Sequence, residues 1–384
     1  MKDINRFISY VLVAMLSSVV TMMVFCRVPE ESYNKLGVVA DLIETCFIED
    51  VDRAAMEEAA AMAMVDSLGD KWSYYLPAKD YEDYTEQLQN AYVGIGVSIT
   101  VAKDGTGFLV KEVNQGGSAE EAGMVAGDVI TMIEGNATAG MTIAQARELI
   151  RGETGTKVAL TIRRDGELME LSVTRKVVET PVADSSMLEN GIGLVRIYNF
   201  DDRCAKESIA AIEELLQQGA TGLILDVRFN PGGYRRELVD LLDYLLPEGP
   251  LFRSEDYSGA VTVDESDAQY LDLPMAVLVN EYTYSAAEFF AAALDEYDAA
   301  VVVGMPTIGK GYYQNTFELL DGSVVGLSTG KYTTPNGVSL TDVGISPEIC
   351  VEVDDVTTYM IYAGVLAPEE DPQMQAAVEA LRTK

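Results

Sequence analysis

The sequence contains no histidine among its 384 residues. This absence excludes the Ser-His-Asp triad, the Cys-His dyad and most histidine-ligated zinc sites. Any hydrolytic chemistry must therefore use lysine, carboxylates or a metal bound through oxygen. Cysteine is also scarce, and the four residues form no Cys-x-x-Cys pair: Cys26, Cys46, Cys204 and Cys350. Neither a zinc site nor a disulfide framework is expected from them.

Positively charged residues are also few. Lysine and arginine number 27 against 62 aspartates and glutamates, which gives a formal net charge of −35. Such a surface repels phosphate backbones and anionic lipid, so no nucleic-acid partner is expected. A solvated acidic surface is the simplest interpretation. Hydrophobic residues make up 48% of the chain, enough for a sizeable core, and the length is typical of two or three domains.

The N-terminus carries one long apolar segment. Phe7 to Cys26 is a run of 20 residues without a charge, and at 1.5 Å per residue it just spans a hydrocarbon core of about 30 Å. Lys2 and Arg6 precede the run, which favours a cytoplasmic N-terminus. We therefore predict a single-pass anchor in the cell membrane over residues 1–28, with the body of the chain on the extracytoplasmic side. A cleaved signal peptide is the main alternative, although the run is long for one and no Ala-x-Ala-like site follows it.

The rest of the chain divides by its hydrophobic pattern. Residues 29–90 have helical spacing and many alanines, which predicts an N-terminal helical region. Residues 91–177 alternate short β-branched runs with glycine turns, as in a small α+β module. Residues 190–352, within a domain assigned to 178–365, alternate strands and helices, which is typical of an α/β layer fold. Residues 366–384 end in an amphipathic helix. The predicted fold class is therefore α+β multidomain.

Ser285 stands where a strand is expected to turn into a helix. The apolar run Met275–Val279 predicts a buried strand, and the helical pattern begins near Ser285. Free backbone N–H groups and the positive end of the helix dipole at such a position stabilise a developing anion, as a catalytic nucleophile requires. The alternative is an N-cap serine, because Glu288 three residues on completes a capping-box pattern. From these residues alone, the cap is the better interpretation.

Lys310 lies between two glycines, Gly309 and Gly311. Flanking glycines let a backbone pass close to another element. A lysine acts as a base only when it is neutral, and burial in an apolar pocket lowers its pKa by several units from about 10.4. Gln314, four residues on, is a candidate to hydrogen-bond Lys310 and to aim it. The alternative is a solvated lysine in a glycine-rich loop.

A third segment contains a strong turn signal. A buried strand over 222–227 runs into Asn230-Pro231-Gly232-Gly233. Glycines in this turn can expose a backbone N–H to an oxyanion. On its own the segment is better explained as an ordinary turn.

Taken together, the three segments resemble the C-terminal processing peptidases, also called tail-specific proteases, of family S41. The family pattern Thr-x-Ser-Ala-x-Glu is present at Thr283–Glu288. The family lysine follows the serine by 25 positions, with glutamine four further on, as Lys310 and Gln314 do here. Three further segments match the family turn, its Tyr-x-x-Pro-x-Gly motif and its Gly-Ile-x-Pro motif: Asn230–Gly233, Gly330–Gly337 and Asp342–Pro347.

The resemblance covers roughly residues 29–352 and implies a crotonase/ClpP-like α/β serine protease core over 178–365. Ser–Lys is a recognised nucleophile–base pair. The resemblance implies Ser285 as nucleophile, Lys310 as base and Gln314 as the residue that orients it. No metal and no organic cofactor is implied. The backbone donors implied for the oxyanion hole are those of Gly232, Gly233 and Ala286.

The resemblance also accounts for the module over 91–177. The segment Gly94-Ile95-Gly96-Val97 resembles the carboxylate-binding loop of a PDZ domain, and Gly123–Ile130 resembles the turn before the central PDZ strand. Exposed N–H groups in such a loop can hold a terminal carboxylate while an extended tail adds to the sheet edge. Taken alone, Gly-Ile-Gly is better explained as a plain β-turn. Further along, Thr142 is expected to cap a helix over 143–150.

These inferences predict a membrane-anchored serine endopeptidase that cleaves proteins near exposed C-termini. Its partners would be protein or peptide substrates, the membrane and, from the family resemblance, a second copy bound through the N-terminal helices. One alternative is a catalytically idle, membrane-tethered PDZ scaffold. A crotonase-like acyl-CoA enzyme does not account for the inserted module. Two departures from the family bear on substrate preference: Ala287 replaces a second serine, and Tyr284 replaces a small residue beside the nucleophile.

Overall fold

The computed structural model describes residues 34–188 and 191–383. The predicted anchor over residues 1–28 lies outside them. In the described part, no helix is both long and apolar enough to cross a membrane. The chain divides into two compact units, Met1–Gly69 and Asp70–Lys384.

The described part of the first unit consists of helices α2 (Lys35–Cys46) and α3 (Arg53–Asp66). Each begins at a side-chain cap, because Asn34 and Asp52 accept hydrogen bonds from backbone N–H groups of their first turns. Arg53 joins the two helices through ion pairs with residues of α2 and α3, at 2.9 Å to Asp41, 2.7 Å to Glu44 and 2.8 Å to Glu57.

A six-stranded sheet forms the centre of the second unit, in the order β10-β11-β12-β15-β16-β19. Its neighbours are parallel except for the edge pair β10–β11. Its central strands are continuous apolar runs, as expected where both faces of a parallel sheet are covered. The bounds are β10 (Ala183–Met187), β11 (Ile192–Ile197), β12 (Gly222–Asp226), β15 (Met275–Val279), β16 (Ala300–Gly304) and β19 (Ile349–Cys350).

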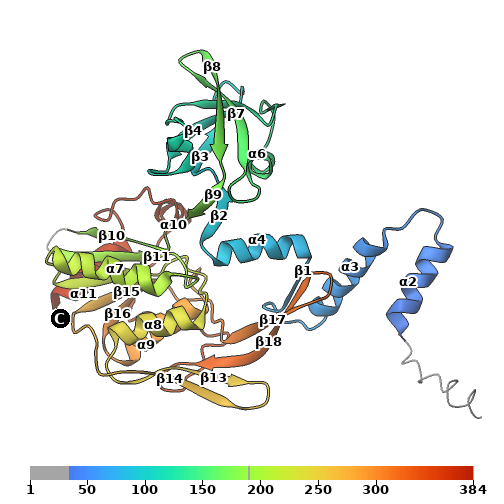
Figure 1. Cartoon of the computed structure of the whole chain (residues 1–384). Coiled ribbons are helices and arrows are strands. Elements are labelled where there is room, and N and C mark those ends of the chain that lie inside the picture. Colours follow the sequence, from blue (N-terminus) through green and yellow to red (C-terminus); the bar gives the residue numbers. More distant parts are fainter. Residues whose placement is uncertain (1–33, 189–190, 384) are drawn as a thin grey trace, which may run out of the picture. The chain divides into compact units, whose positions relative to one another are not determined.

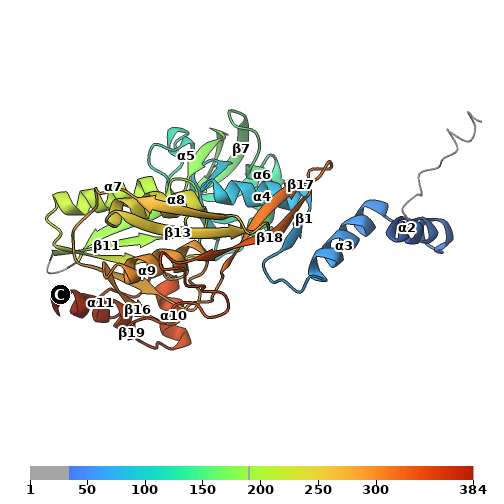
Figure 2. The ribbon, with the colours of Figure 1, turned by 90° about the horizontal axis from the view of Figure 1, so that it is seen from below.

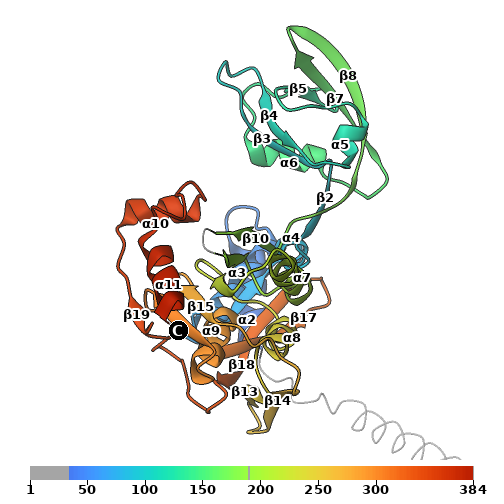
Figure 3. The same cartoon turned by 90° about the vertical axis from the view of Figure 1, so that its left-hand side faces the viewer.

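Helices cover both faces of this sheet. In β15, Val277 and Val279 point to the face covered by α7 (Cys204–Gln217), α8 (Arg235–Leu245) and α9 (Ala286–Glu296). Ala276 and Leu278 point to the opposite face, against α11 (Pro372–Thr383). This division follows from the two-residue period of a strand, and Figure 3 shows α11 and the α7–α8 pair on opposite sides of β15. The strand predicted over 275–279, the helix after Ser285 and the terminal helix are confirmed.

A second sheet has the order β1-β18-β13-β14, with β17 also paired to β18. Figure 2 shows the long strands of this sheet beside helices α8 and α9. Its first strand lies within residues 29–90, the region predicted to be helical. There Tyr74-Tyr75-Leu76 forms a strand instead, because its aromatic residues favour one and it pairs with β18. Helix α4 (Ala78–Leu88) follows. The bounds are β1 (Tyr74–Leu76), β13 (Gly249–Asp256), β14 (Val261–Ser266), β17 (Tyr312–Glu318) and β18 (Val324–Thr333).

The module predicted over 91–177 has a β-sheet and its own apolar core. Strands β2 (Ala91–Gly94) and β9 (Lys176–Glu179) pair as the ribbon that enters and leaves it (Figure 1). Helix α6 (Ile143–Ile150) begins at Thr142 with a complete capping box, so the predicted helix and its cap are confirmed. The remaining elements are β3 (Val97–Val101), β4 (Phe108–Val113), α5 (Ser118–Glu121), β5 (Val129–Ile133), β6 (Asn136–Ala137), β7 (Lys157–Arg164) and β8 (Glu167–Thr174).

Candidate active site

Ser285 is the N-cap residue of α9 and has an unusual backbone. Its φ is 60° and its ψ is −129°, and the residue is 9% exposed. A non-glycine residue in such a conformation costs about 1–3 kcal/mol and persists only where its surroundings hold it there. The conformation therefore distinguishes Ser285 from an ordinary helix cap, whose backbone is extended.

Hydrogen bonds hold the turn before Ser285 against the end of β12. The Thr283 hydroxyl donates to the Val227 carbonyl at 2.9 Å. The Tyr284 N–H donates to the Asn230 carbonyl at 3.1 Å. These bonds place the Asn-Pro-Gly-Gly turn beside the serine, as parallel neighbours β12 and β15 end at the same edge of the sheet.

Gly232 lies directly against the serine. A Cβ on Gly232 would stand 2.7 Å from Ser285 Cβ and 2.8 Å from Ala286 N, so no larger residue fits. The Gly232 N–H is already engaged, since it donates to Asn230 Oδ1 at 2.8 Å. In the described part of the chain, the N–H groups of Gly233 and Ala286 have no acceptor. Of the three donors predicted from the sequence, these two are available to an oxyanion.

Lys310 is on the loop between β16 and β17. A Cβ on Gly309 would stand 2.7 Å from Val343 N, and a Cβ on Gly311 would collide with Thr341. The expected close passage of this backbone along another element is therefore confirmed. That element is the 340–344 segment, which contains the start of the Asp342–Pro347 motif. The loop also reaches the serine turn, because Ile308 N–H donates to the Thr283 carbonyl at 3.3 Å.

Two aromatic rings shelter the Lys310 ammonium. Its Nζ lies 4.7 Å from the centre of the Trp72 ring and 6.0 Å from that of Tyr284, and the two rings stack at 5.8 Å. Burial lowers the pKa of Lys310 from 10.5 to about 8, against the opposing effect of the charges on Asp70 and Glu288. At this pKa about a tenth of the lysine is neutral at pH 7, and about half is neutral at pH 8. Sequence reasoning missed Trp72, although the chain has only this one tryptophan and it stands in an aromatic turn.

Glu288 links the serine to the lysine loop. Its carboxylate is fully buried and accepts the N–H of Ser285 at 2.9 Å, of Gly309 at 2.7 Å and of Lys310 at 2.8 Å. It also accepts the hydroxyl of Thr307. One side chain therefore fixes the backbones of both candidate catalytic residues. The sequence pattern indicated only the capping half of this role.

Substitution of Glu288 by glutamine is expected to weaken both folding and catalysis. The glutamine amide has one acceptor oxygen where the carboxylate has two, and its NH₂ group would face N–H donors. Buried N–H donors would then lack an acceptor, and each such donor lowers the free energy of unfolding by about 1–3 kcal/mol. We expect a fall in Tm of several degrees and a fall in kcat/KM. Because Glu288 raises the pKa of Lys310, the alkaline-rising limb of the pH–rate profile should also move to lower pH. Calorimetry and a pH-dependent cleavage assay measure these effects.

Glu281, exposed in the same turn, provides the matched control. Glu281→Gln should change Tm and kcat/KM little. A Glu288→Gln variant with unchanged Tm and an unmoved pH limb would contradict the linking role of this carboxylate.

Gln314 is not brought to Lys310 by any hydrogen bond of the described residues. Its amide donates to Ser328 Oγ at 3.0 Å and to the Tyr312 carbonyl at 3.3 Å. The Ser328 N–H donates in turn to Ser73 Oγ at 3.0 Å, and Ser73 Oγ donates to Asp70 Oδ2 at 2.6 Å. The charge on Asp70 raises the pKa of Lys310. Gln314 is therefore connected to the lysine only indirectly among the described residues, through Ser328, Ser73 and Asp70.

The pH dependence of cleavage should report on Lys310. A general base must lose its proton before it can accept one, so kcat/KM should rise with pH and level off above the lysine pKa of about 8. The measurement is a pH series with a small ester or peptide substrate in buffers of constant ionic strength. A flat profile between pH 6 and 9 would contradict the assignment of Lys310 as base.

Asp201 supplies the control for this series. It is 9% exposed, its Oδ1 has no hydrogen-bond partner among the described residues, and a Cβ on Gly233 would stand 2.6 Å from that oxygen. Burial, with the charges of Asp202 and Glu237, raises the pKa of Asp201 to about 7. Because Asp201 also titrates near neutrality, the limb near pH 8 must persist in Asp201→Asn if it belongs to Lys310.

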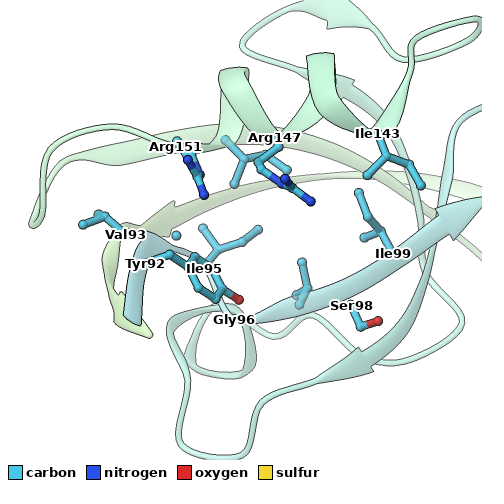
Figure 4. A pocket seen from close by; sticks show the side chains of 12 residues that line it. Tyr92, Val93, Ile95, Gly96, Ser98, Ile99, Ile143, Arg147 and Arg151 are labelled. Carbon is cyan, nitrogen blue, oxygen red and sulfur yellow. The ribbon is translucent and has the colours of Figure 1, made fainter. Parts of the chain in front are cut away.

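The residues predicted to bind a tail line a groove in the smaller module. The four residues Gly94–Val97 connect the end of β2 to the start of β3, and α6 forms the opposite wall (Figure 4). Strand β3 is an edge strand, so its outer backbone groups are available for pairing. In the described part of the chain, no group of three or more potential metal ligands is present.

Comparisons with known proteins agree with this arrangement. The model of peptidase family S41 matches residues 191–351, and a PDZ model matches residues 109–164. The chain is 32% identical over 329 residues to the carboxy-terminal processing protease CtpA of Bacillus subtilis (strain 168), covering 85% of this chain and 70% of that protein. It is 28% identical over 330 residues to a Staphylococcus aureus (strain N315) protein described as a CtpA-like serine protease, covering 85% of this chain and 66% of that one.

Among solved structures, one from Bacteroides fragilis NCTC 9343, described as an S41 protease, covers 90% of this chain and 97% of its own, with a TM-score of 0.53 and 17% identity. At that identity the likeness concerns the fold alone. The extent and identity of the match to the Bacillus subtilis protein show the family, and the resemblance inferred from the three motifs is thus confirmed. The chain belongs to peptidase family S41 and carries a PDZ domain.

Proposed function

We propose that the chain is a serine endopeptidase that cleaves proteins near their C-termini with Ser285 as nucleophile and Lys310 as general base. The observation that carries the proposal is the shared hydrogen bonding of Glu288 to the backbones of both residues. The strained backbone of Ser285 and the lowered pKa of Lys310 support it independently.

In the proposed reaction, neutral Lys310 Nζ takes the proton from Ser285 Oγ as the oxygen attacks the scissile carbonyl. The oxyanion that forms accepts hydrogen bonds from the N–H groups of Ala286 and Gly233. Lys310 then returns the proton to the leaving amine, and the acyl group remains on Ser285. Water, deprotonated by Lys310, attacks this ester; Lys310 then gives that proton to Ser285 Oγ as the second product leaves. We assign the core to the crotonase/ClpP-like fold.

The PDZ domain is proposed to bind the free C-terminus of the substrate. The N–H groups of the Gly94–Val97 loop would hold the carboxylate, and the tail would add to the open edge of β3. The body is proposed to lie outside the cell, tethered by the apolar segment Phe7–Cys26. A homodimer through the N-terminal helices is supported by the apolar side chains that α2 exposes: Leu36, Val39, Leu42 and Ile43.

The test compares the full chain with its Ser285→Ala variant on an unfolded protein that ends in apolar residues. An idle PDZ scaffold would bind this substrate equally well, so binding cannot separate the two functions. Cleavage can: only the peptidase produces fragments, and only while Ser285 is present. Equal survival of the substrate with both proteins would leave the scaffold as the function.

A further inference from the structure

Two arginines line the PDZ groove, Arg147 on α6 and Arg151 at the C-cap of that helix. Arg151 is already paired, at 2.9 Å to Asp83 and 3.2 Å to Glu86. Arg147 forms no ion pair with any described residue, although the chain has 62 acidic residues and 27 basic ones. Figure 4 shows its side chain directed from the helix into the groove. An exposed guanidinium with five donors and no acidic partner therefore lines the path of the tail.

The end of the groove near the glycine loop is apolar. Ile95 is 2% exposed and Ile150 is 8% exposed, and both line the groove beside Val97. A terminal carboxylate on the loop N–H groups would place the last side chain of the tail over these residues. The last residue of the tail is therefore expected to be apolar.

The spacing along α6 indicates which tail residue reaches Arg147. From Ile150 to Arg147 the helix rises about 4.5 Å, at 1.5 Å per residue. An extended tail advances about 3.3 Å per residue and turns every second side chain to the same wall. If the last side chain of the tail faces α6, the next one that does so belongs to the third residue from the end. Its side chain comes within reach of the long Arg147 side chain.

We propose that Arg147 selects substrates whose tails carry aspartate or glutamate at the third position from an apolar end. The inference rests on the proposed tail binding and adds to it the chemistry of the preferred substrate. The strongly acidic chain repels acidic tails in general, so a local guanidinium is what lets the groove accept one. An exposed ion pair of this kind contributes a three- to five-fold preference in affinity at low salt, and less as salt screens it.

Peptide binding to the full chain tests the proposal. The Ser285→Ala background prevents cleavage, and the probes are fluorescent ten-residue peptides with a free apolar end and Glu, Ala or Lys at the third position from it. We expect the affinity order Glu, Ala, Lys, with Glu three- to five-fold tighter than Ala. Arg147→Gln should remove the preference for Glu while leaving the Ala peptide unchanged. Arg147→Glu should invert the order. Lys111→Gln, an exposed cation on β4 outside the groove, should preserve it.

Two results would overturn the inference without touching tail recognition. In one, the Glu and Ala peptides bind equally to the Ser285→Ala chain. In the other, Arg147→Gln weakens all three peptides by the same factor, which would mean that the arginine holds the terminal carboxylate instead. Tail recognition itself fails if no free-ended peptide binds, or if peptides with an amidated end bind as tightly as those with a free end. In either case the inference about Arg147 fails with it.

Discussion

Replacing Ser285 with alanine should abolish cleavage while leaving the fold intact. Removal of a nucleophile from a serine peptidase site costs at least ~10³-fold in kcat, because the remaining groups act only by binding and by polarising the carbonyl. The Tm should change little, since alanine removes one hydroxyl while the Ser285 N–H keeps its hydrogen bond to the Glu288 carboxylate. Cleavage of an unfolded protein, followed by mass spectrometry of the fragments, measures the loss.

Ser258 offers the matched control, as an exposed serine between β13 and β14. Ser258→Ala should retain full activity. A covalent serine reagent should add one mass equivalent to the wild-type chain and to Ser258→Ala, and none to Ser285→Ala. Labelling that persists in Ser285→Ala would assign the nucleophile to another residue.

Replacing Lys310 with methionine should remove activity to a similar extent and should raise stability at neutral pH. Methionine fills the space beneath Trp72 but cannot accept the serine proton. Because burial lowers the pKa of Lys310 to about 8, the folded chain is destabilised by the ammonium below that pH. The variant should therefore be more stable than wild type at pH 7, by no more than ~3 kcal/mol. This difference should shrink as pH rises from about 8 toward 10.5, and denaturant titrations at several pH values measure it.

Lys71 makes a demanding control, because its ammonium also lies over the Trp72 ring, at 4.8 Å, yet its side chain is 57% exposed. Lys71→Met should keep at least half of the activity. Lys310→Arg should be as inactive as Lys310→Met, since a guanidinium keeps its charge without giving up a proton. An active Lys310→Arg variant would exclude the lysine as base.

Local pattern was sufficient for many elements. The apolar run over 275–279 is a strand, Thr142 caps its helix, and the glycines beside Lys310 do accompany a close backbone contact. These features depend on residues a few positions apart, which a sequence displays directly. The strand at Tyr74–Leu76 was missed because its partner, β18, lies about 250 residues away along the chain.

The same distinction applies to the candidate site. The sequence by itself determined the absence of histidine chemistry and the family, and it indicated Ser285 and Lys310 as the candidate pair, because residue types and a fixed spacing carry that information. Only the tertiary structure decided three contacts. The Trp72 ring packs over the lysine, Glu288 accepts hydrogen bonds from the backbones of Ser285 and Lys310, and the Gly232 N–H donates to Asn230. Each depends on a contact between segments distant in sequence. Burial and hydrogen-bond partners, which set the lysine pKa and leave the candidate oxyanion donors free, exist only once those segments have packed together.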